Sequence, residues 1–206
     1  MSKDVNLNKV KELYDQNIRD HGAEPESVGW GNQEKIDLRF EKLLDVVEMP
    51  NEEFSVSELG CGYGELVKYC ENYSLNLGDY EGYDISEDML VAAREYVQGE
   101  RITWVNSDKV LKKADYVIAS GIFNVPFDND RDQWKSYVLS TIEHLFEMSN
   151  KGASFNMLTK YVDYESENLF YNDPLEIFDH CKRNLTNKVN LVHDYPLYEF
   201  TIHLIK

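Results

Sequence analysis

The chain has 206 residues, of which 42% are hydrophobic, 29% charged and 13% aromatic. These proportions predict one globular domain with a full hydrophobic core, and they exclude an intrinsically disordered chain. No stretch approaches the roughly 18 apolar residues that a membrane-spanning helix requires. The first residues, Met1 to Asn6, lack the apolar centre of a secretory signal, so we expect a cytoplasmic protein.

The charge balance argues against two classes of partner. Lys and Arg number 21 against 38 Asp and Glu, which gives a formal net charge of −17. Nucleic-acid binding rests on cations that neutralise phosphates, so we expect neither a nucleic acid nor an anionic membrane as partner. The three cysteines form no C-x-x-C pair and the five histidines have no zinc-binding spacing, so we expect reduced thiols and no metal.

The first fifty residues have the pattern of two helices. Apolar residues recur at three- and four-residue spacing from Leu7 to Ile18 and again from Ile36 to Val47. Gly22 stands where the first helix would end, and Pro50 would stop the second. We therefore expect a helical N-terminal extension over residues 1–50, placed to fold as a lid, and a main domain over residues 51–206.

After Pro50 short apolar runs alternate with amphipathic stretches. We expect helices near residues 66–70, 86–97 with Ser86 as N-cap, 134–146 with an end near Gly152, and 174–181 with Asp173 as N-cap. We expect strands at residues 54–59, 80–84, 102–105, 116–119, 153–158, 189–192 and 200–205. This alternation predicts an α/β fold: a doubly wound, mostly parallel seven-stranded sheet with helices on both faces. Because no helix separates the last two strands, they should form a C-terminal antiparallel hairpin.

A glycine-rich turn follows the first expected strand. The run from Glu58 to Gly64 reads E-L-G-C-G-Y-G and leads into a helix. Glycine allows sharp turns and close approach of a ligand to the backbone, and a helix start favours an anionic group. Asp84 comes 20 residues beyond Gly64, at the end of the second strand, where a carboxylate accepts hydrogen bonds from a ribose. Together these features predict a nucleoside-binding crevice at the carboxyl edge of the sheet.

The spacing of the glycines indicates which nucleoside is bound. A dinucleotide fingerprint requires a third glycine three residues after the second, and Glu65 occupies that position. Glu58, two residues before the first glycine, would favour an ammonium group and oppose a pyrophosphate. S-adenosylmethionine has the matching groups: an amine, a carboxylate, a sulfonium and a ribose.

At this point the sequence resembles the class I S-adenosylmethionine-dependent methyltransferases. Three stretches carry the resemblance: Glu58–Gly64, Gly82–Leu90, and Asn106–Asp108 with Asp115–Gly121. The resemblance spans residues 54–206, and the terminal hairpin is similar to that of the family. It implies S-adenosyl-L-methionine as cofactor and S-adenosyl-L-homocysteine as product.

The resemblance also implies roles for individual residues. The turn formed by Gly60, Cys61, Gly62 and Gly64 would hold the methionine part, with Glu58 near its amine. The other implied contacts are Asp84 with the ribose, Ile85 and Met89 with the adenine ring, Asp108 with the adenine amino group, and Ser120 and Gly121 beside the sulfonium, with Ser107 as a further cofactor-binding residue. Ordinary core packing for Ile85 and Met89, and a helix cap for Asp108, remain open as alternatives.

The methyl acceptor is less well defined by the sequence. Methyltransferases that act on nucleic-acid bases carry a D/N-P-P-Y/F motif at the fourth strand, and here Asn124-Val125-Pro126-Phe127 matches it only loosely. We therefore expect transfer to an oxygen or nitrogen of a small molecule. A non-catalytic cofactor-binding or activator subunit of the same fold is the alternative, and a nicotinamide-dependent reductase is disfavoured by the glycine spacing.

Candidate acceptor residues lie outside the nucleoside-binding core. Aromatic walls with a few polar groups suit a small organic molecule, which singles out Tyr14, Trp30, Arg39, Asn124 and Tyr171. For a general base, His144, His193 and His203 are options, since histidine titrates in the useful range. A lone histidine in a helix or strand is more often structural, so we assign no catalytic residue. The sequence does not define the oligomeric state.

Overall fold

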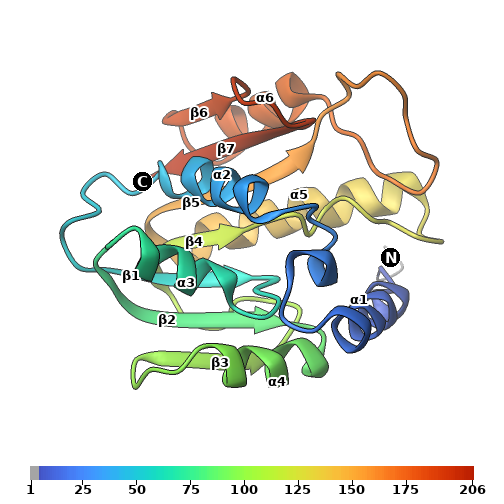
Figure 1. Cartoon of the computed structure of the whole chain (residues 1–206). Helices are drawn as coiled ribbons and strands as arrows, with labels where there is room; N and C mark the ends of the chain where they lie inside the picture. The colour runs from blue at the N-terminus through green and yellow to red at the C-terminus, as the bar shows by residue number, and fades with distance from the viewer. Residues whose placement is uncertain (1–4) are drawn as a thin grey trace.

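The computed structural model describes residues 5–206 of the chain. Its strands are β1 (Phe54–Leu59), β2 (Leu77–Asp84), β3 (Ile102–Asn106), β4 (Ala114–Ala119), β5 (Ser149–Leu158), β6 (Val189–Val192) and β7 (Glu199–Ile205). They form one sheet in the order β3-β2-β1-β4-β5-β7-β6 (Figure 1). The first five strands pair in parallel, and β7 is antiparallel to both β5 and β6. The predicted α/β fold with a C-terminal antiparallel hairpin is therefore confirmed.

Helices cover both faces of this sheet. They are α1 (Asn8–His21), the 3₁₀ turn η1 (Pro25–Val28), α2 (Gln33–Leu44), α3 (Glu65–Asn72), α4 (Glu87–Tyr96), α5 (Arg131–Met148) and α6 (Pro174–Asn184). Neighbouring residues of β4 face opposite ways: Val117 packs with α5 and α6, and Ile118 packs with α2 and α3. Along residues 5–206, no helix combines the length and apolarity that crossing a membrane requires.

The local signals place most helix starts correctly. The Ser86 hydroxyl accepts from the Met89 N–H, and the Asp173 carboxylate accepts from the Leu175 N–H, so both predicted N-caps are confirmed. The strand after α5 begins at Ser149 rather than at residue 153. It starts early because its first residues already pair with β4, and because Gly152 lets the backbone of Leu204 approach closely. The end of α5 near Gly152 was therefore placed too late.

The N-terminal segment divides into two parts with different packing. Ile36, Phe40 and Leu43 of α2 are buried in the same core cluster as β1, so this helix belongs to the body of the domain. By contrast, α1 lies beyond the carboxyl ends of β1 and β2 (Figure 1). The Ser86 hydroxyl donates to the Asp15 carboxylate over 2.6 Å and so ties α1 to the start of α4.

Candidate functional site

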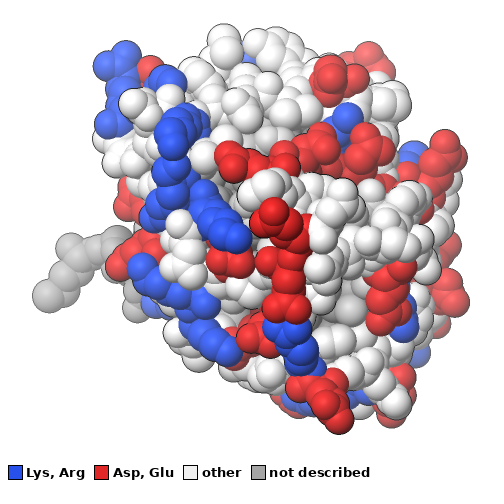
Figure 2. Space-filling view, turned by 90° about the vertical axis from the view of Figure 1, so that its left-hand side faces the viewer, with Lys and Arg blue, Asp and Glu red and all other residues white. Residues whose placement is uncertain are grey.

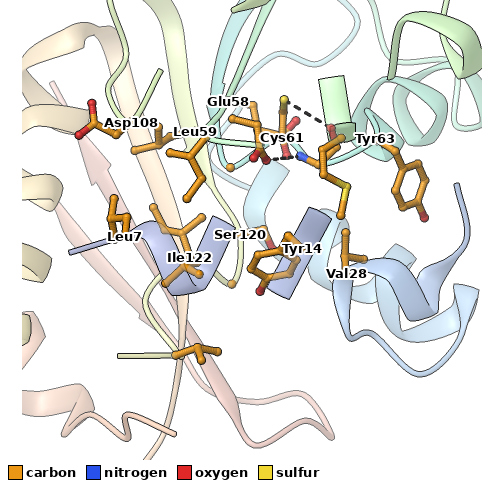
Figure 3. A pocket seen from close by; sticks show the side chains of 18 of the residues that line it. Leu7, Tyr14, Val28, Glu58, Leu59, Cys61, Tyr63, Asp108, Ser120 and Ile122 are labelled. Carbon is orange, nitrogen blue, oxygen red and sulfur yellow. Dashed lines mark hydrogen bonds between the residues drawn. The ribbon is translucent and has the colours of Figure 1, made fainter. Parts of the chain in front are cut away.

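A cavity of about 100 Å³ lies where β1, β2, β3 and β4 end, against α1 and the η1 turn (Figure 3). Eleven of the twelve predicted cofactor residues line it: Glu58, Gly60, Cys61, Gly62, Asp84, Ile85, Met89, Ser107, Asp108, Ser120 and Gly121. The structure thus brings residues from four strand ends into one hollow.

The glycine turn needs glycine at each of its three positions. Gly60, Gly62 and Gly64 have φ values of +75°, +53° and +88°, a region that side chains with a Cβ disfavour. A Cβ on Gly60 would lie 2.2 Å from Ile122, so this bend also needs the space. Gly64 does not line the cavity; it begins α3, with Trp104 packed against it. Its role is to shape the backbone.

Asp84 faces the cavity as a preorganised acceptor. Its Oδ2 accepts from the Gly62 N–H over 2.9 Å, and its Oδ1 accepts from the Ser86 N–H over 2.8 Å. Burial raises the pKa of the Asp84 carboxyl, and these two backbone donors oppose that rise. Each carboxylate oxygen keeps acceptor capacity after these bonds, which suits two adjacent hydroxyl groups.

Glu58 is a second buried carboxyl in the cavity wall, with only 2% of its surface exposed. The Tyr80 hydroxyl donates to its Oε2. Burial raises the pKa of Glu58 to about 8, so the carboxyl on its own is largely protonated at neutral pH. A cationic ligand group beside it would favour the ionised form and form an ion pair.

The cavity lining also contains Ile85, Met89, Ser107 and Asp108. Met89 is 1% exposed and packs with Ile18 and Tyr63, so it has the core packing that was the alternative, and its contact with the adenine ring stays a prediction. No helix follows Asp108 before β4, so the helix-cap alternative for this carboxylate is wrong.

The turn after β4 closes the cavity floor. Gly121 has a φ of +70°, and its N–H donates to Asn156 Oδ1 over 2.7 Å. The Trp30 ring lies against it, 3.4 Å from where a Cβ of Gly121 would stand. Ser120 and Gly121 are therefore held between β5, which accepts the Gly121 N–H, and the loop before α2, which contributes Trp30.

The five predicted acceptor residues separate into two groups. Tyr14 and Trp30 line the cavity, and burial together with the nearby Asp84 raises the pKa of Tyr14 to about 12. Arg39, Asn124 and Tyr171 lie outside the cavity lining and have other partners. Arg39 pairs with Glu199, Asn124 Oδ1 accepts from the Leu158 N–H, and the Tyr171 hydroxyl accepts from the Ser166 N–H.

None of the three histidine candidates lines the cavity. His144 and His203 bond the carbonyl groups of Val110 and Lys42, respectively, and burial lowers the pKa of His203. His193 packs beside the Tyr161 ring. The geometry therefore gives no support to a histidine base at this site.

Sequence reasoning missed the apolar wall of the cavity: Leu7, Val10, Val28, Phe40, Leu59, Ile122, Val125 and the aromatic residues Tyr63 and Tyr137. The spacing of Leu7, Val10 and Tyr14 on one side of a helix was the available signal for its roof. It also missed Glu65, which is 8% exposed; its Oε1 accepts from Gln33, and its Oε2 has no hydrogen-bond partner among the described residues.

Comparison with known proteins identifies a relative with this chain's sequence pattern. The Mycobacterium tuberculosis protein named "Putative methyltransferase Rv1506c" is 40% identical over 152 residues, covering 72% of this chain and 91% of that protein. No protein-family model matches the chain.

Solved structures share the fold at low sequence identity. Magnesium protoporphyrin IX methyltransferase from Synechocystis PCC 6803 with bound SAH aligns with a TM-score of 0.66 and 14% identity, over 98% of this chain and 100% of that one. Human N-acetylserotonin methyltransferase in complex with SAM aligns with a TM-score of 0.63 and 14% identity, over 96% of this chain and 59% of that one. A DhpI–SAH complex aligns with a TM-score of 0.58 and 14% identity, over 93% and 92% of the two chains.

Proposed function

The chain belongs to the class I S-adenosylmethionine-dependent methyltransferases, and from this premise we propose that it transfers a methyl group to an oxygen or nitrogen of a small organic molecule. The cofactor of the proposed reaction is S-adenosylmethionine, and S-adenosylhomocysteine is the product. The observation that carries the proposal is the arrangement of Asp84 and the glycine turn, joined by the Gly62–Asp84 hydrogen bond.

The polar groups of the cavity match the cofactor part by part. Asp84 retains acceptor capacity for the two ribose hydroxyls, and Asp108, which also lines the cavity, would accept from the adenine amino group. Glu58 supplies a carboxylate for the ammonium of the methionine part. Ile85 and Met89 provide apolar surface for the adenine ring.

The proposed reaction needs alignment more than chemical groups from the protein. S-adenosylmethionine supplies a methyl group on a positively charged sulfur, which is displaced in line by the acceptor. Holding two reactants in line contributes up to about 7–11 kcal/mol to lowering the barrier. Here the Gly121 turn, Trp30 and Tyr14 would orient the acceptor, because they line the cavity next to the predicted sulfonium position.

A small acceptor is favoured by the walls of the cavity and by the surface charge. The lining is dominated by aliphatic and aromatic side chains, which suit a small organic molecule. On the face shown in Figure 2, a narrow band of basic side chains has acidic side chains on both sides. Such a surface disfavours a nucleic-acid acceptor. The three cysteines, all free and buried, fit the proposed cytoplasmic location.

Two measurements test the proposal. Isothermal titration calorimetry should detect binding of S-adenosylhomocysteine, and methyl-labelled cofactor incubated with a pool of small metabolites should label a product. Absence of binding by either form of the cofactor would refute the proposal. Binding without transfer to any acceptor would favour the alternative of a cofactor-binding activator subunit.

A further inference from the structure

Behind the cavity wall a hydrogen-bonded network of three buried polar side chains connects three parts of the fold. Arg39 of α2 forks onto Glu199 of β7, with Nε and Nη2 lying 2.5–3.0 Å from the carboxylate oxygens. Asn156 of β5 donates from Nδ2 to Glu199 Oε2 over 3.1 Å. The three side chains are 9%, 6% and 1% exposed, so their mutual bonds are the main satisfaction of their charge and polarity.

This network of side chains has a fixed direction of hydrogen bonding. Arg39 offers only donors and Glu199 only acceptors, so Asn156 must turn its amino group toward Glu199. Its carbonyl oxygen then faces the other way, where it accepts from the Gly121 N–H over 2.7 Å. Without the Glu199 carboxylate, Asn156 Nδ2 loses its acceptor, and only the Gly121 N–H and the Ser120 hydroxyl still favour this orientation of the amide.

Both ends of this network reach residues that line the cavity. One end holds Gly121, and the next residue, Ile122, lies directly over Gly60 of the glycine turn. At the other end, the Arg39 guanidinium stacks on the Trp30 ring at 4.9 Å, and that ring lies against Gly121. Trp30 and the Gly121 turn are therefore gripped by the same buried charge pair.

We propose that Glu199 is a positioning residue for methyl transfer, which acts through Asn156 and Arg39 to fix the Gly121 turn and Trp30 around the methyl group. This inference rests on the proposed function, because it takes the sulfonium to lie beside Ser120 and Gly121. It also explains why Arg39, which has the chemistry of a substrate-binding residue, faces β7 instead of the cavity.

The test compares the affinity of the two cofactor forms in Glu199→Gln, since only the donor form carries the methyl group. Calorimetry should show S-adenosylmethionine binding weakened about tenfold, as expected for one misdirected buried hydrogen bond, with S-adenosylhomocysteine binding changed less than about twofold. A role in stability alone would weaken both ligands equally or neither.

A spectroscopic measurement reports on this network without any ligand. The protein contains 11 glycines, so ¹⁵N-glycine labelling gives a simple amide spectrum. The Gly121 amide signal should shift in Glu199→Gln. The matched control is Glu53→Gln, which removes the carboxylate from an exposed Arg101 fork. It should shift Gly78, which lies beside that fork, and leave Gly121 and the ratio of the two affinities unchanged.

Arg39→Lys keeps the positive charge but loses the fork and the stacking on Trp30, and it serves as the second variant if Glu199→Gln does not fold. It should change the affinity ratio in the same direction. An unmoved Gly121 signal together with an unchanged ratio would overturn the inference. If the unmodified protein bound neither cofactor form, the proposed function would fail, while the Gly121 signal would still report on the hydrogen-bonded network.

Discussion

Replacement of Glu58 by glutamine should have opposite effects on stability and on cofactor binding. The carboxyl is buried against Tyr80, and burial raises its pKa from the ordinary value of 4.5 to about 8. Between these two values the folded protein keeps a proton that the unfolded chain releases. Unfolding is therefore increasingly favoured as pH rises through this window, and the loss of stability levels off above pH 8.

The size of this effect follows from the two pKa values. At pH 7 the carboxyl of the unfolded chain is about 2.5 pH units above its pKa and ionised, whereas that of the folded protein is mostly protonated. This difference lowers the free energy of unfolding by about 3 kcal/mol at pH 7 and by less than about 1 kcal/mol at pH 5. Glutamine has no proton to lose and its carbonyl oxygen still accepts from Tyr80. The stability of Glu58→Gln relative to the unmodified protein should thus rise by about 2 kcal/mol between pH 5 and pH 7.

Urea unfolding of both proteins at the two pH values measures this difference, and calorimetry measures the affinity for S-adenosylhomocysteine. The variant should bind about 10- to 100-fold more weakly, because a charge-assisted hydrogen bond to the ammonium group is lost. Glu100→Gln, at an exposed position, is the control and should alter neither quantity. A pH-independent stability difference would contradict the buried-carboxyl argument, and unchanged affinity would contradict the amine contact.

Three further predictions concern other parts of the site. Gly60→Ala should abolish cofactor binding, because its Cβ would lie 2.2 Å from Ile122. Gly29 has a similar positive φ but open space around the position of a Cβ. Gly29→Ala should therefore lower the free energy of unfolding by only the backbone strain, about 1–2 kcal/mol in a denaturant titration, and an equal loss of cofactor binding in both variants would refute the steric argument. Asp15→Ala should speed hydrogen exchange in α1 and cofactor dissociation, whereas Lys9→Ala, which removes an exposed ion pair, should change neither. The three buried cysteines, whose thiol pKa values burial raises, should react with a thiol reagent at pH 8 only after unfolding; rapid labelling of the native protein would contradict their burial.

Much of the fold was predictable because its signals are local. The glycine turn, the N-caps at Ser86 and Asp173 and the helix-free stretch before β7 each depend on a few adjacent residues. Cofactor residues were predictable for a related reason, since parallel strands bring their carboxyl ends to one edge and so place Asp84, Asp108 and Ser120 together.

The acceptor side was less predictable because it depends on contacts between distant segments. Arg39 is separated from Glu199 by 160 residues, and no local pattern indicates that this cation is neutralised inside the core. Asn124 likewise bonds the backbone of β5, although the sequence made it a candidate acceptor residue. The apolar face of α1 indicated a helix, but only its docking on α4 shows that Leu7 and Val10 roof the cavity.

A crystal structure with S-adenosylhomocysteine bound tests the central claim most directly. The account predicts both ribose hydroxyls within about 3.2 Å of the Asp84 carboxylate, with the methionine part resting on Gly60–Gly62. Ligand density elsewhere on the molecule, or a ribose that makes no contact with Asp84, would contradict it.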